Sequence, residues 1–164
     1  MQNHNCRKFD YDIALSFAGE DRKYVEQVAS FLLKSGLKVF YDKYEKVNLW
    51  GKDLYQHLDK VYQHTSKYVV IFISTNYEKK LWTSHELKSA QARAFSESEE
   101  YILPARFDKT EIPGVRKTIG YINLVEHKPN ELAKLLIAKL AQFKLENILP
   151  TDATKLGCTT ILQG

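Results

Sequence analysis

Hydrophobic positions along the chain form short apolar runs that alternate with segments of helical spacing. Five runs predict strands, at residues 9–17, 37–41, 68–73, 101–106 and 121–124. The run at 68–73 is apolar at every position, which is typical of a strand buried on both faces of a parallel sheet. Four other segments repeat apolar residues every three or four positions and therefore predict helices. This order of elements predicts a single α/β domain, with one five-stranded parallel sheet flanked by helices.

Residues with strong positional preferences mark the ends of the predicted helices. Asp21 suits the N-cap of the first helix, Gly36 suits the position just after its end, and Pro129 suits the first turn of the last helix. Residues 74–80 follow neither pattern and are expected to form a loop. The last helix is expected to face the core with Leu132, Leu135, Leu136, Leu140 and Phe143. We expect a lead-in at residues 1–8, a domain at 9–145 and a linker or tail at 146–164.

Composition narrows the classes of function. The net charge is only +4, from 24 basic and 20 acidic residues of interspersed sign, so no nucleic-acid surface is expected. The five histidines and two cysteines show no ligand spacing, so no metal site is expected. The longest apolar run is too short to span a bilayer, and no apolar leader is present. We therefore expect a cytoplasmic protein with no membrane partner.

The candidate chemistry lies in residues 81–87, Leu-Trp-Thr-Ser-His-Glu-Leu, which open a predicted helix after the central strand. In one interpretation Thr83 and Glu86 form a capping box, in which Glu86 bonds back to the amide of Thr83. In the other, Glu86 is the catalytic group of a crevice whose wall is Trp82. Ligands of open α/β sheets bind beyond the carboxyl ends of strands, which is where this segment starts. The two roles are compatible, and these residues alone leave both open.

Several nucleotide-using families are excluded by missing motifs. The chain has no G-x-G-x-x-G fingerprint, no P-loop and no G-x-S-x-G elbow. A phospho-receiver would need an aspartate at the end of the third strand, where this chain has Ser74.

Four segments in order resemble the TIR (Toll/interleukin-1 receptor) domain family. They are residues 11–21, 36–42, 48–54 and 82–87, and the resemblance extends over about residues 9–143. The Trp-Gly pair at 50–51 is more similar to bacterial members than to animal receptor adaptors. The resemblance implies a flavodoxin-like TIR fold with strand order 2-1-3-4-5, in which the exits of the first and third strands lie side by side.

The resemblance also implies the activity of an NAD⁺ glycohydrolase with Glu86 as the catalytic residue. It implies substrate contacts at Phe17, Ala18, Gly19, Asp42, Trp50 and Trp82. NAD⁺ is then a substrate, so no cofactor or metal is required. Nicotinamide departs as a neutral molecule, so one carboxylate that stabilises the oxocarbenium-like sugar is enough. Whether the product is linear ADP-ribose or a cyclic isomer stays open.

Catalytic members of the family are activated by self-association. The resemblance therefore implies TIR–TIR contacts, a sensor domain or partner protein, and a role in bacterial anti-phage defence signalling. One alternative is a non-catalytic TIR interaction module that signals through the loop at 42–51. Another is a flavodoxin-like small-molecule binder from a different family.

Overall fold

The computed structural model describes residues 9–41, 50–51, 60–61, 65–81 and 101–148. Its centre is a five-stranded sheet in which every neighbouring pair is parallel, in the order β2-β1-β3-β4-β5. The predicted sheet and its strand order are thus confirmed. The strands are β1 (Tyr11–Ser16), β2 (Val39–Phe40), β3 (Ser66–Ile73), β4 (Ile102–Arg106) and β5 (Ile122–Asn123).

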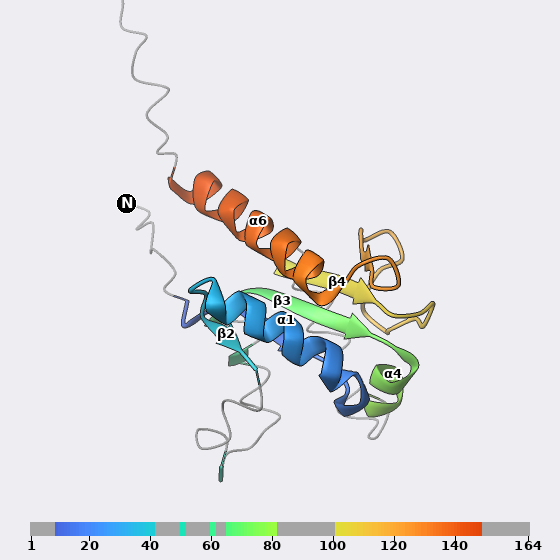
Figure 1. Cartoon of the computed structure of the whole chain (residues 1–164). Helices are drawn as coiled ribbons and strands as arrows, with labels where there is room; N and C mark the ends of the chain where they lie inside the picture. Colours follow the sequence, from blue (N-terminus) through green and yellow to red (C-terminus); the bar gives the residue numbers. More distant parts are fainter. Residues whose placement is uncertain (1–8, 42–49, 52–59, 62–64, 82–100, 149–164) are drawn as a thin grey trace, which may run out of the picture.

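The described helices are η1 (Gly19–Asp21), α1 (Arg22–Lys34), α4 (Thr75–Leu81) and α6 (Pro129–Ile148). α1 and α6 pack against each other and cover one face of the sheet (Figure 1). None of these described helices is long and apolar enough to cross a membrane.

β3 supplies both cores of the domain, which explains its continuous apolar run. Tyr68, Val70 and Phe72 pack with residues of α1 and α6 on one face of the sheet. Val69, Ile71 and Ile73 pack on the opposite face, with Tyr77, Ile112 and Val115 among their neighbours. Since side chains alternate between the two faces of a strand, only an apolar residue at every position can satisfy both cores.

The predicted helix ends at Gly36 and Pro129 are confirmed. Gly36 has a φ of +80°, a conformation that is unfavourable for residues other than glycine. The amides of Gly36 and Leu37 donate to the carbonyls of Leu33 and Leu32 at 2.9 and 3.2 Å, which is the Schellman arrangement. Pro129 is the first residue of α6.

Residues 74–80 were expected to form a loop, but residues 75–80 instead belong to α4. The carboxylate of Asp108 accepts a hydrogen bond from the Thr75 amide at 2.9 Å. Ser74 Oγ accepts another from the Tyr77 amide at 3.1 Å. These bonds satisfy amides that a short helix would otherwise leave unpaired. Because Asp108 lies beyond the next strand, local sequence does not reveal this cap.

Two further expectations change in the structure. β2 contains two residues where five were predicted. Leu135 is 41% exposed, whereas Leu132, Leu136 and Leu140 are buried, so the buried face of α6 follows every fourth residue.

Pro104 lies inside β4 opposite Ile71, but the ladder to β5 starts only at Ala105. At the level of Pro104, β4 thus has a strand partner on one side only, which proline tolerates.

Replacing Leu136 with alanine should lower the free energy of unfolding by about 2–5 kcal/mol, because it leaves a cavity under α6. Leu135→Ala removes the same atoms from an exposed position and should cost less than about 1 kcal/mol. Urea unfolding of both variants measures the difference. Equal losses would show that the inward face of α6 is wrongly assigned.

Candidate functional site

The carboxyl ends of β1 and β3 lie next to each other at the sheet edge where a ligand is expected. Their parallel register pairs Ser16 with Ile71. β1 leads into η1 through Phe17 and Ala18, and β3 leads through Ser74 into α4. Since β1 lies between β2 and β3, the chain reverses its direction of winding here, at the kind of switch point where open α/β sheets bind ligands.

Phe17 is packed into the core and holds an arginine at this edge. Its side chain is 5% exposed and stacks on Tyr41, with ring centroids 5.4 Å apart and planes 16° from parallel. The Arg22 guanidinium carbon lies 5.1 Å from the Phe17 centroid and 5.7 Å from that of Tyr41. Arg22 Nη1 also donates to the Tyr41 hydroxyl at 3.1 Å. The stack therefore fixes a positive charge beside the ends of β1 and β2.

Ala18 is buried, whereas Gly19, the first residue of η1, is exposed. A Cβ atom built on Gly19 would meet no atom within 4 Å. Of the three predicted contacts after β1, Gly19 therefore offers open surface, whereas Phe17 and Ala18 are buried.

A buried polar cluster joins the two strand exits. Ser74 Oγ donates to Asp21 Oδ2 at 2.5 Å, and the Ser16 and Tyr77 hydroxyls are 2.7 Å apart. Asp21 stands at the N-cap position of α1, but its side chain makes no cap hydrogen bond, which corrects the expected role. Its carboxylate is engaged by Ser74 instead. The cluster thus ties the start of α1 to the start of α4.

Burial raises the pKa of Asp21 above its ordinary value, although the Ser74 hydroxyl opposes the shift. The negative charges of Glu20 and Asp108 raise it further. The Asp21 carboxylate is therefore costly to keep ionised, as expected for a half-buried group among other acids.

The remaining predicted site residues lie in or near segments outside the described residues. Trp50 is described and 88% exposed, so its ring is available to a ligand or another protein surface. Asp42, Trp82 and Glu86 are outside the described part of the chain. Their roles stay predictions. α4 ends at Leu81, so the Trp82 motif follows directly from a helix fixed at the β1–β3 edge.

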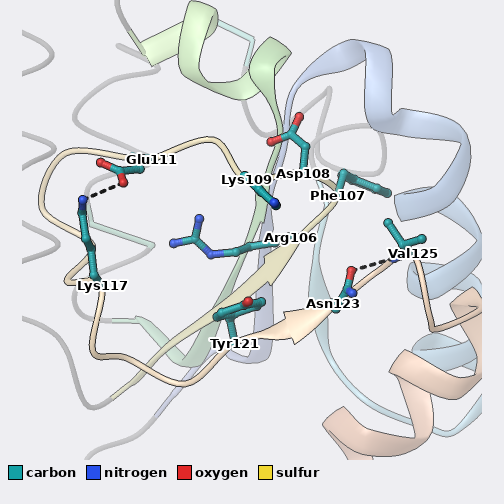
Figure 2. A pocket seen from close by; sticks show the side chains of 9 residues that line it. All are labelled: Arg106, Phe107, Asp108, Lys109, Glu111, Lys117, Tyr121, Asn123 and Val125. Atoms are coloured by element: carbon teal, nitrogen blue, oxygen red, sulfur yellow. Dashed lines mark hydrogen bonds and ion pairs between the residues drawn. The ribbon is translucent and has the colours of Figure 1, made fainter.

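A pocket of about 500 Å³ lies at the same edge of the sheet, beyond the ends of β4 and β5 (Figure 2). Its lining residues are Arg106, Phe107, Asp108, Lys109, Glu111, Lys117, Tyr121, Asn123 and Val125. The only sign of this pocket in the sequence is Arg106 at the end of a predicted strand. Tyr121 comes next to Arg106 only when β5 pairs with β4.

A sequence model of the TIR domain matches residues 13–136. The chain belongs to the TIR domain family. The TIR domain of the Toll-related receptor TRR-2 from Hydra magnipapillata has a similar fold, with a TM-score of 0.51. That match has 14% sequence identity and covers 84% of this chain and 97% of the Hydra domain.

Curated bacterial relatives of this TIR domain are named as cyclic ADP-D-ribose synthases or as an NAD(+) hydrolase. The 3′ cyclic ADP-D-ribose synthase AaTIR of Aquimarina amphilecti is 62% identical over 134 residues, covering 82% of this chain and 41% of that protein. The 2′ cyclic ADP-D-ribose synthase AbTIR of Acinetobacter baumannii is 30% identical, covering 78% and 50%. The NAD(+) hydrolase TirS of Staphylococcus aureus is 32% identical, covering 69% and 39%. The chain thus spans two fifths to half the length of these relatives.

The raised pKa of Asp21 predicts how stability changes with pH. Folding favours the protonated form, so this group's contribution is fully present below its unfolded-state pKa and is lost as pH rises through the folded-state pKa. Asp21→Asn keeps an oxygen for Ser74 and has no charge to desolvate. Thermal unfolding between about pH 3 and pH 7 should therefore show the variant at least as stable as the parent near neutrality, with its relative advantage shrinking in acid.

Asp12→Asn is the control of opposite sign. Burial alone would raise the pKa of Asp12, but hydrogen bonds from Lys67 and the Lys38 amide and the charges of Lys67 and Lys144 lower it overall. Asp12 therefore stabilises the fold above its unfolded-state pKa, and Asp12→Asn should lose stability near neutrality. If Asp21→Asn lost as much stability as Asp12→Asn at neutral pH, the raised pKa of Asp21 would be contradicted.

Proposed function

We propose that this TIR domain cleaves NAD⁺ at the bond between nicotinamide and ribose. The observation that carries the proposal is the 62% identity to a 3′ cyclic ADP-D-ribose synthase across 82% of the chain. The matched family region, residues 13–136, includes the Trp82 and Glu86 positions. The described residues support a site at the β1–β3 edge, where Gly19 is open and Arg22 places a positive charge suited to a pyrophosphate.

In the proposed reaction, the C–N bond breaks and nicotinamide leaves with the electron pair as a neutral molecule. The ribose carbon becomes oxocarbenium-like, and the Glu86 carboxylate stabilises the growing positive charge. Trp82 forms an aromatic wall for a planar ring of the substrate. A hydroxyl group then attacks the ribose carbon and releases its proton to water, which restores charge balance without a metal or an added cofactor.

The identity of the attacking hydroxyl decides the product. Water gives linear ADP-ribose, whereas a hydroxyl of the distal ribose gives a cyclic isomer. We favour the 3′ cyclic isomer, because the 62%-identical relative AaTIR is named for that product, while the 2′ cyclic synthase AbTIR is 30% identical. Cyclisation further requires that the site exclude water while the sugar is reactive.

The proposal extends to how the activity is controlled. We propose that self-association through TIR–TIR contacts activates the domain, so the dilute chain should have low activity. The relatives are longer than this chain, which supports a sensor domain or partner protein as the source of clustering. We place this activity in the cytoplasm, as part of antiviral defence signalling.

Glu86→Gln should lower the rate of NAD⁺ loss by at least about 100-fold at every protein concentration, because the amide cannot stabilise a cation. Glu78→Gln, a change of the same kind on α4, should keep the parent rate. Chromatography of nicotinamide and of the ADP-ribose product over a series of protein concentrations measures both. In the parent protein, the rate per molecule should rise with concentration.

Two outcomes would count against the proposal. A Glu86→Gln variant with the parent rate would remove Glu86 from the chemistry. A parent protein that leaves NAD⁺ intact at every concentration, with a crowding agent included, would favour a non-catalytic interaction module.

A further inference from the structure

We propose that the pocket beyond β4 and β5 is a second, non-catalytic ligand site that binds a phosphate-bearing mononucleotide. It is separate from the β1–β3 edge, because β3 lies between β1 and β4 in the sheet. Its volume of about 500 Å³ lies within the range of small-molecule sites. This inference does not depend on NAD⁺ cleavage.

The lining carries three cationic side chains, Arg106, Lys109 and Lys117. In the described part of the chain, neither Arg106 nor Lys109 is paired with a carboxylate. Lys117 pairs with Glu111 at 2.7 Å, but both side chains are largely exposed, at 78% and 66%. An exposed pair of this kind contributes little, so Lys117 can exchange Glu111 for a phosphate at small cost.

The other carboxylate of the lining does not cancel this charge locally. Asp108 accepts hydrogen bonds from Thr75 through Oδ2 and from the Thr110 amide through Oδ1. Figure 2 shows it turned away from the Arg106 side chain, toward the end of β3 and α4. Asp108 is thus committed to capping α4, and the interior of the pocket is left with positive charge.

Arg106 is held in place before any ligand arrives. Its Nη1 donates to the Thr110 carbonyl at 2.6 Å, and its guanidinium carbon lies 5.0 Å from the centroid of the Tyr121 ring. Its Nε is buried and has no hydrogen-bond partner among the described residues. A guanidinium fixed at two points, with no carboxylate paired to it among residues 9–41, 50–51, 60–61, 65–81 and 101–148, is preorganised for an oxyanion such as phosphate.

Two exposed side chains of the lining suit a flat, less polar group. Tyr121 is 56% exposed and Val125 is 79% exposed. The Asn123 side chain is engaged within its loop, where it donates to Glu126 and accepts from the Val125 amide. An anion at the cationic side chains and a ring against Tyr121 beside them together describe a nucleotide, because aromatic side chains stack on any base.

The test uses AMP as the probe with the full 164-residue chain, followed by residue-resolved NMR titration. AMP should shift the backbone signals of Lys109, Tyr121 and Val125. Inorganic phosphate, which lacks the base, and adenosine, which lacks the anion, should each bind at least about tenfold more weakly. Added salt should weaken AMP binding, since the lysines are exposed.

The variant is the double substitution Lys109→Gln/Lys117→Gln, which should weaken AMP binding about tenfold or more. Lys23→Gln/Lys34→Gln removes the same charge from exposed positions on α1 and should bind like the parent. Both pairs are on the surface, and the spectrum itself reports whether each variant is folded.

The proposal is overturned if AMP shifts only signals near Gly19 and leaves Tyr121 and Val125 unchanged. It is also overturned if the two double variants lose affinity equally. Phosphate that binds as tightly as AMP would reduce the pocket to a general anion site and contradict the nucleotide assignment.

Discussion

The parallel pairing of β1 with β3 is the constraint on which the other features depend. From Val69 to Ile73 every side chain of β3 is at most 1% exposed, so a shift of register by one residue would exchange the contents of the two cores. The carboxyl ends of both strands are therefore fixed side by side. This places Gly19, which follows β1, and Ser74, which follows β3, at one edge of the sheet.

Polar contacts then set the direction of the chain beyond that edge. The Ser74–Asp21 and Ser16–Tyr77 hydrogen bonds attach α4 to β1 and α1, and Asp108 caps α4 from beyond β4. The helix that leads to the Trp82–Glu86 segment is thus anchored to β1, to the start of α1 and to the segment after β4. The two acids that anchor α4 lie in different regions of this edge. Asp21 lies at the switch point, whereas Asp108 lines the cationic pocket of Arg106.

Much of the fold could be predicted because it follows from local patterns. The apolar run of β3, the Schellman glycine Gly36 and the helix-starting Pro129 each specify their own surroundings. α4 could not be predicted, since Asp108 caps it from 33 residues away along the chain. Nor could the stacking of Phe17 on the Tyr41 ring be predicted, or the pocket, which needs β5 to place its residues next to β4. For the candidate site, the family pattern predicts Glu86, Trp82 and Asp42, and these positions lie outside the described residues.

In the proposed reaction, NAD⁺ is bound and cleaved where β1 and β3 end. The most direct measurement is an experimental structure of the chain, at a concentration where it self-associates, with a non-cleavable carbocyclic NAD⁺ analogue. We expect the nicotinamide and its sugar ring to lie beside Gly19, with the Glu86 carboxylate against that ring. An analogue bound elsewhere, with Glu86 enclosed by protein and out of its reach in every subunit, would contradict it.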